Sequence, residues 1–113
     1  MRIAFTAKGE SWDSMIDERF GRAQYILLYD DEKKELNCRN NSSINDVAHG
    51  AGPQTAKHVL DMNPDIVITG NGPGGNAGSV LSQRKIKIYT GAGNMTIKQA
   101  YDAYINNSLQ LLD

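Results

Sequence analysis

Glycines gather in two short segments whose spacing suits close contact with an anionic ligand. Residues 70–75 read GNGPGG and match the pattern G-x-G-x-x-G, and residues 91–94 form a second glycine-rich turn. A dinucleotide-binding fingerprint would place an acidic residue about 20 positions further on, where residues 89–92 (YTGA) carry none. The lysine and hydroxyl pair of a P-loop is also missing. The pattern favours a loop whose backbone N–H groups approach an anion. A tight turn that needs positive φ is the alternative.

Two arginines flank an aromatic residue and a glycine in the order Arg19, Phe20, Gly21 and Arg22. Guanidinium groups neutralise anions, and a glycine lets a ligand approach the main chain closely. The same residues are also typical of the entry to a strand, with solvated arginines and a packed phenylalanine. Spacing alone leaves both interpretations open.

His49 and Cys38 are the candidate metal ligands. His49 precedes Gly50 in a small-residue loop, where an imidazole nitrogen can bind a metal or donate to an anion. A loop histidine bonded to the backbone is the alternative, and His58 is interpreted as a surface or packing residue. Cys38 is the single cysteine. It is expected to act as a small hydrophobe, with a ligand role open if it lies near a strand end.

No arrangement of residues indicates catalysis. Metal-dependent nuclease chemistry needs clustered carboxylates, but residues 3–7 contain no Asp or Glu, and Asp65 begins its apolar segment rather than ending it. A G-x-S-x-G nucleophile elbow is absent from the sequence. One cysteine cannot supply the four thiolates that enclose a conventional iron–sulfur cluster. The chain is therefore predicted to be a binding protein and not an enzyme.

Composition places the chain among ordinary globular proteins. Its 113 residues suit a single domain over residues 1–113, and 40% are hydrophobic and 22% charged. The net charge of −1 is unlike the basic surface of a general nucleic-acid binder. No apolar run approaches the roughly 20 residues that span a bilayer. We expect a cytoplasmic protein that binds neither membrane nor nucleic acid.

Hydrophobic periodicity predicts five strands and three helices. The expected strands are Arg2–Ala7, Gln24–Asp30, Glu35–Asn40, Asp65–Thr69 and Lys85–Tyr89, and the expected helices are Pro53 to about Met62, Asn76–Gln83 and Thr96–Asn107. The order βββαβαβα predicts an α/β fold, a three-layer α/β/α sandwich of ribonuclease-H-like type around a mixed five-stranded sheet. Leucines near the C-terminus are expected to tie down the tail.

This topology gathers the candidate residues at one edge. If strands one, three, four and five run parallel and strand two runs back, the loops 8–22, 40–52, 70–75 and 91–94 meet at the carboxyl ends of the strands. Three of these loops lead into helices, whose N-termini offer unpaired N–H groups and a partial positive charge. Open α/β sheets bind ligands at this edge, so an anion site is expected there.

The order of several short motifs resembles the dinitrogenase iron–molybdenum cofactor biosynthesis family, of the type found in NifX and the C-terminal domain of NifB. The motifs are residues 3–5 (IAF), 17–25 (DERFGRAQY), 49–52 (HGAG), 67–70 (VITG) with Gly72, Gly74 and Ala77, and 86–89 (IKIY). The resemblance covers nearly the whole chain. It implies the ribonuclease-H-like sandwich and the binding of iron–molybdenum cofactor or its iron–sulfur precursor. It also implies transfer of that cluster between donor and acceptor proteins.

The resemblance carries Phe20, Gly21, Arg22 and His49 over as site residues. Family members often have histidine before Phe-Gly-Arg, where this chain has Arg19. A guanidinium group can attract sulfide electrostatically but cannot replace a neutral imidazole ligand.

We therefore expect a non-catalytic carrier for an anionic metallocluster at the carboxyl edge of the sheet. The expected cofactor-binding residues are Arg19, Phe20, Gly21, Arg22, His49, Gly50, Gly70, Gly72, Gly74, Gly75 and Gly91, and the expected metal ligands are His49 and Cys38. One alternative is an enzyme or sensor that binds a phosphorylated small molecule or a nucleotide at the same glycine-rich edge. Another is an interaction domain that regulates a partner without a ligand.

Overall fold

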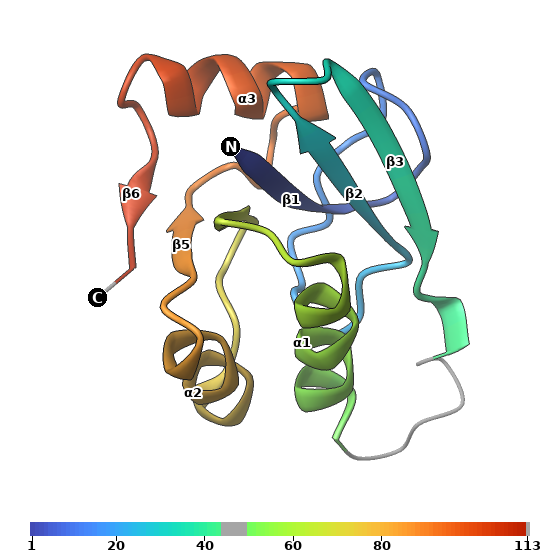
Figure 1. The fold of residues 1–113 in the computed structure, drawn as a ribbon, viewed down its shortest axis with the longest axis vertical. Helices are drawn as coiled ribbons and strands as arrows, with labels where there is room; N and C mark the ends of the chain where they lie inside the picture. Colours follow the sequence, from blue (N-terminus) through green and yellow to red (C-terminus); the bar gives the residue numbers. More distant parts are fainter. Residues whose placement is uncertain (44–49, 113) are drawn as a thin grey trace.

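Six strands form one mixed sheet within residues 1–43 and 50–112, which the computed structural model describes (Figure 1). They are β1 (Arg2–Ala7), β2 (Tyr25–Asp30), β3 (Glu35–Asn40), β4 (Ile66–Ile68), β5 (Lys87–Thr90) and β6 (Gln110–Leu111), in the spatial order β3-β2-β1-β4-β5-β6. Strand β1 is parallel to β4, and β4 is parallel to β5. Strand β2 is antiparallel to both of its neighbours, β1 and β3. The predicted directions of the first five strands are therefore confirmed.

The prediction of a five-stranded sheet is wrong. The short strand β6 adds a sixth, antiparallel to β5, in the register Tyr89 with Leu111 and Thr90 with Gln110. The backbone N–H of Leu112 also donates to the carbonyl of Ile88 at 2.8 Å. Two residues are too few to show an alternating pattern, so the sequence indicates only that the tail packs and not that it pairs.

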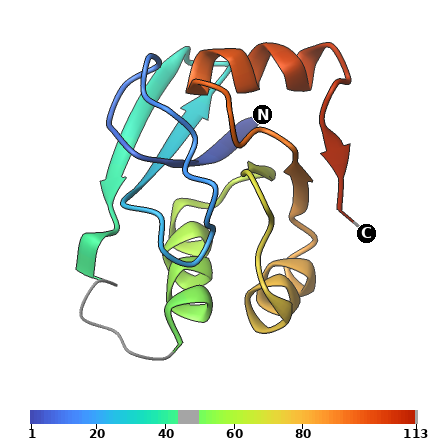
Figure 2. The same ribbon diagram turned by 180° about the vertical axis from the view of Figure 1, so that it is seen from behind.

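Helices cover both faces of this sheet. Helices α1 (Ala51–Met62) and α2 (Gly75–Gln83) lie on one face and α3 (Ile97–Ile105) lies on the other (Figures 1 and 2). Side chains of β1 alternate between the two layers, with Ala4 packed toward α1 and α2, and Ile3 and Phe5 packed toward α3. Burial on both faces explains why β1 and β4 read as apolar runs. The ribonuclease-H-like assignment stays a prediction.

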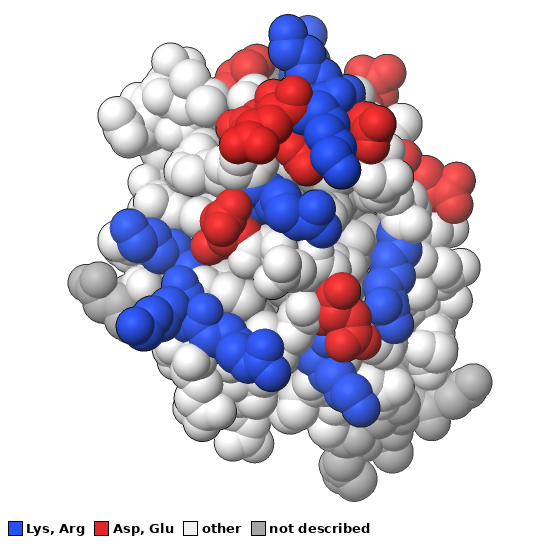
Figure 3. Space-filling view, in the orientation of Figure 1, with Lys and Arg blue, Asp and Glu red and all other residues white. Residues whose placement is uncertain are grey.

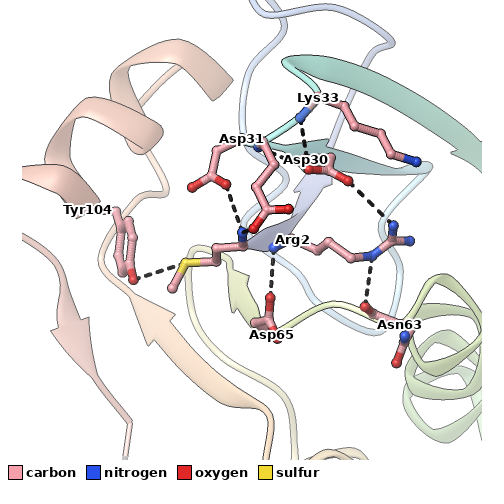
Figure 4. A network of polar contacts seen from close by, with 9 residues as sticks. Arg2, Asp30, Asp31, Lys33, Asn63, Asp65 and Tyr104 are labelled. Carbon is pink, nitrogen blue, oxygen red and sulfur yellow. Dashed lines mark hydrogen bonds and ion pairs between the residues drawn. The ribbon is translucent and has the colours of Figure 1, made fainter.

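At the edge of the sheet where the parallel strands β1 and β4 begin, here called the amino edge, a network of polar contacts surrounds Arg2 (Figure 4). Arg2 Nε donates to the Asn63 carbonyl at 3.0 Å and Nη2 donates to the Met62 carbonyl at 2.6 Å, which satisfies carbonyls at the end of α1. The backbone N–H of Arg2 donates to Asp65 Oδ2 at 2.8 Å, and the N-terminal ammonium pairs with Asp31 at 2.7 Å. These contacts give the amino edge a structural role.

Charges of both signs are intermixed on the face that Figure 3 shows, rather than separated into one basic surface. Among the helices of the described residues, none is long and apolar enough to cross a membrane.

Candidate functional site

Three loops meet backbone to backbone where β1, β4 and β5 end. The N–H of Asn71 donates to the Glu18 carbonyl at 2.9 Å, and the N–H of Gly91 donates to the Gly70 carbonyl at 3.0 Å. A methyl group at Gly70 would lie 2.7 Å from Glu18 Cα and 3.2 Å from Gly93 Cα. Gly70 therefore permits the packing of these loops. The N–H groups of Asn71 and Gly91 hold the loops together, so they are less available to a ligand than the sequence suggests.

Beside this junction, the N-termini of α1 and α2 lie next to each other. Gly50 and Gly74 are their N-cap residues, and neither helix has a side-chain cap or an acidic residue in its first turn. A methyl group at Gly52 would lie 3.5 Å from the Ala77 side chain, so the two first turns are in contact. A methyl group at Gly50, Gly74 or Gly75 would meet no atom of the described residues within 4 Å. As far as residues 1–43 and 50–112 show, two partial positive charges thus adjoin open space.

Helix α3 begins differently. The Thr96 hydroxyl accepts from the Gln99 N–H at 3.1 Å, and the Gln99 side chain accepts from the Thr96 N–H at 2.9 Å, forming a capping box. The next N–H groups, of Ile97 and Lys98, donate to the carbonyls of Ser14 at 2.8 Å and Trp12 at 3.0 Å. The first turn of α3 is therefore already satisfied by the protein. The N-terminus of α3 is therefore not part of the candidate anion site, which consists of the N-termini of α1 and α2.

The Arg-Phe-Gly-Arg segment lies against α1. Phe20 is only 2% exposed and packs in the core beneath α1 and α2, so it anchors the segment rather than facing a ligand. A methyl group at Gly21 would lie 3.1 Å from Gly52 Cα, in the first turn of α1. The side chain of Arg19 is 66% exposed, and Arg22 is half-buried. Both arginines thus belong to a segment fixed beside the N-terminus of α1.

A buried polar network that the sequence analysis missed fixes this segment. Thr55 of α1 donates its hydroxyl hydrogen to the Gly21 carbonyl at 3.0 Å and accepts from Asn41 Nδ2 at 3.0 Å. Asn41 Nδ2 also donates to the Ala23 carbonyl at 2.8 Å, and Asn41 Oδ1 is hydrogen-bonded to His58 Nδ1. In the sequence, this network is indicated only by Thr55, a polar residue among the apolar positions of the buried face of α1.

His58 thus has a structural contact rather than a place at the candidate site. Burial, aided by the charges of Arg39 and Lys57 and opposed by that of Asp61, lowers the pKa of His58 below 6.5.

Cys38 is exposed on the edge strand β3. It pairs in register with Leu27, which packs on the α3 face, while the neighbouring Arg39 reaches Asp61 of α1 at 3.8 Å. Successive strand residues point to opposite faces, so Cys38 points away from α1. Partial burial, and secondarily the charge of Glu10, raises the pKa of the Cys38 thiol. This favours the neutral thiol over the thiolate that binds metals.

The predicted ligand His49 lies outside the described residues, within residues 44–49. Among residues 1–43 and 50–112, no group of three or more His, Cys, Asp or Glu side chains is arranged to hold a metal ion.

Comparison with known proteins identifies relatives for the whole fold. A family model described as dinitrogenase iron-molybdenum cofactor matches residues 1–107. The apo form of the orange protein from Desulfovibrio gigas has a TM-score of 0.92 and 27% identity, and the match covers 98% of this chain and 92% of that one. A Thermotoga protein provisionally described as NifB, of the DUF35 family, has a TM-score of 0.81 and 30% identity over 96% of this chain and 90% of that one. A search of curated proteins finds no match.

Proposed function

The chain belongs to the dinitrogenase iron–molybdenum cofactor family, and on this premise we propose that it is a non-catalytic carrier of an anionic metallocluster. The cargo is iron–molybdenum cofactor or an iron–sulfur precursor, bound at the carboxyl edge of the sheet. Donor and acceptor proteins for the cluster are its partners.

The paired N-termini of α1 and α2 are the observation that carries this proposal. Gly50 and Gly74 leave their first-turn N–H groups without a side-chain cap, and the first turns touch through Gly52 and Ala77. Because each helix end carries a partial positive charge, two adjacent ends attract a polyanion more strongly than one. A metallocluster with several sulfides on its surface is such an anion.

Binding mainly through N–H groups suits a carrier. In the described part of the chain, the donors near the two helix ends are backbone N–H groups and arginines rather than several thiolates or imidazoles. Hydrogen bonds and charge hold most of the surface of a preassembled cluster without replacing its own ligands, and a single protein ligand is more easily exchanged than four, so the cluster can leave intact. Arg19 and Arg22 add positive charge, and we propose His49, which directly precedes Gly50 in the sequence, as a protein ligand. The orange protein structure is an apo form, which accords with a ligand-binding role in that relative.

Anaerobic reconstitution tests the proposal. The protein is incubated with a preformed iron–sulfur cluster or with iron–molybdenum cofactor, then desalted, and the iron retained per chain is counted. We expect the unchanged protein to retain iron close to one cluster per chain. The retained iron should fall in the variant His49→Ala and in the double variant Arg19→Gln with Arg22→Gln. No retention from either cluster source contradicts the carrier function.

Substitution at Gly74 separates the anion site from folding. Gly74 has φ −67° and ψ 175°, an extended conformation that suits an aspartate N-cap. Gly74→Asp caps α2 with a carboxylate, so we expect a more stable protein that retains less iron. Gly74→Ala adds a methyl group into the same open space without a charge and is the matched control. Equal retention by the Asp and Ala variants would remove the α2 N-terminus from the site.

Thermal unfolding measured with nucleotides and with phosphate, beside the iron-retention experiment, distinguishes the cluster from other anions. Two exposed helix N-termini also suit a phosphate group, as a nucleotide or phosphorylated metabolite would provide. Thermal stabilisation by nucleotides or phosphate, without retention of any cluster, would favour this second function.

A further inference from the structure

A hollow lies on the opposite face of the sheet from α1 and α2, between α3, β2 and the loop after β1. It has a volume of about 430 Å³ and is lined by Trp12, Asp13, Tyr29, Lys98, Tyr101 and Asp102. Since the α1 and α2 N-termini belong to the other layer, this hollow is separate from the candidate anion site.

Three aromatic rings form the wall of the hollow. Trp12 packs edge to face on Tyr29, with ring centroids 4.8 Å apart, and on Tyr101, with centroids 5.9 Å apart. Tyr29 and Tyr101 are themselves 5.3 Å apart at 80°. The Trp12 ring also contacts Phe5 edge to face, with centroids 6.3 Å apart, and the Trp12 carbonyl accepts the Lys98 N–H at 3.0 Å. The three rings are thus held in fixed edge-to-face positions beside the hollow, and the face of an aromatic ring is electron-rich.

The charged groups of the hollow make it net negative. Asp13 and Asp102 line it against one cation, Lys98. The pKa of Tyr101 is raised, first by burial and then by the charges of Tyr29, Asp31 and Asp102. The negative charge of Asp31 therefore also acts on this ring. Carboxylates beside aromatic rings favour a weakly hydrated cation, because a ring attracts positive charge only at close range. Alkylated ammonium groups are weakly hydrated cations. Anionic metalloclusters carry the opposite charge and are not expected here.

We propose that this hollow binds the alkylated ammonium group of a small organic cation. The contact is a cation–π interaction with Trp12, Tyr29 and Tyr101, strengthened by Asp13 and Asp102. Lys98 opposes binding by like charge. The proposal does not depend on the metallocluster function.

Trp12 is the single tryptophan of the chain, so its fluorescence reports directly on the hollow. Choline chloride is titrated against 3,3-dimethylbutan-1-ol, which has the same shape without the charge, with sodium chloride matching the ionic strength. We expect saturable quenching by choline and none by the alcohol or the salt. Amide and side-chain NMR shifts are recorded in the same titration, so a complex that leaves the fluorescence of Trp12 unchanged is still detected.

Two charge variants and one control complete the test. Asp102→Asn should weaken choline binding about tenfold, and Lys98→Met should strengthen it. Asp61→Asn on α1 removes an equal charge from the other face of the molecule and should leave binding unchanged. Circular dichroism confirms that each variant is folded. An equal response to choline and its neutral analogue, no response in either spectroscopy, or equal effects of Asp102→Asn and Asp61→Asn would overturn the proposal.

Discussion

Asp17 Oδ1 accepts a hydrogen bond from the backbone N–H of Arg19 at 3.1 Å and lies 3.5 Å from Arg19 Nε. The Asp17 side chain is 1% exposed, and its Oδ2 is buried with no hydrogen-bond partner among the described residues. The main chain of Asp17 is fixed as well, because its N–H donates to the Thr6 carbonyl and its carbonyl accepts from the Thr6 hydroxyl. Part of the positive charge of Arg19 is therefore compensated within the protein before any ligand binds.

Substituting Asp17 should change ligand binding and stability differently. Asp17→Asn keeps an oxygen that accepts from the Arg19 N–H but removes the negative charge, so we expect more iron to be retained after reconstitution. The lost ion pair costs at most about 1 kcal/mol, because Arg19 is largely exposed. Asp17→Ala also removes the acceptor and should cost about 1–3 kcal/mol. Urea denaturation measures stability, and lower iron retention in Asp17→Asn than in the unchanged protein would contradict the expected charge effect.

Two glycines of the segment 70–75, one in the loop after β4 and one at the start of α2, should change stability in opposite directions when replaced by alanine. Gly70→Ala places a methyl group 2.7 Å from Glu18 Cα, and because main chain surrounds it we expect a loss of about 1–3 kcal/mol. Gly75→Ala points a methyl group into open space in the first turn of α2 and should gain up to about 1 kcal/mol. Urea denaturation midpoints at an unchanged slope compare the two. Destabilisation of equal size at both positions would show that the loops pack differently.

The cap of α3 should matter for stability but not for cluster binding. Thr96→Ala removes the hydroxyl that accepts from the Gln99 N–H, and a lost N-cap costs about 1 kcal/mol. Ser79→Ala, at an exposed position inside α2, is the control for loss of a hydroxyl. Denaturation and iron retention are measured on both variants. A loss of retained iron in folded Thr96→Ala would place α3 at the binding site after all.

Local patterns predicted most of the fold. The bounds of β1 and β3 agree with the structure because a buried apolar run and an alternating edge strand each end at charged or polar turns. Helix α1 begins at Ala51 rather than at the expected Pro53, since Gly50, at φ 79°, can form the left-handed N-cap and proline is tolerated anywhere in the first turn. Strand β6 exists only through its pairing with β5, which no local pattern of two residues specifies.

The candidate site was less predictable because its parts are distant in sequence. The glycine-rich spacing indicated that an anion binds at this edge of the sheet. It could not show that the main chain of Glu18 lies too close to Gly70 to leave room for a side chain there. Phe20 was expected near the ligand, yet its burial under α1 depends on packing between layers. The link from Asn41 to Thr55 and Gly21 likewise joins three separate segments. Such contacts follow from tertiary structure rather than from spacing.

His58 should make stability depend on pH through this network. Asn41 Nδ2 donates to Ala23 and Thr55, which leaves Asn41 Oδ1 to accept from His58 Nδ1. Burial, and then the charge of Arg39, lowers the pKa of His58 below its ordinary 6.5. The unfolded chain therefore binds a proton at His58 more readily than the folded one. Stability from this group is complete above about pH 6.5 and is lost as the pH falls through the folded pKa.

The experiment compares urea denaturation midpoints from neutral pH down to about pH 5, above the range in which most carboxylates titrate. The midpoint of the unchanged protein should fall with pH, and that of His58→Asn should fall less, because an amide can donate to Asn41 without titrating. Asp61→Asn removes the charge that opposes the shift, so an NMR titration of His58 should give a still lower pKa in that variant. Identical pH profiles for the unchanged protein and His58→Asn would mean that His58 titrates equally in the folded and unfolded states, and that burial does not oppose its charge.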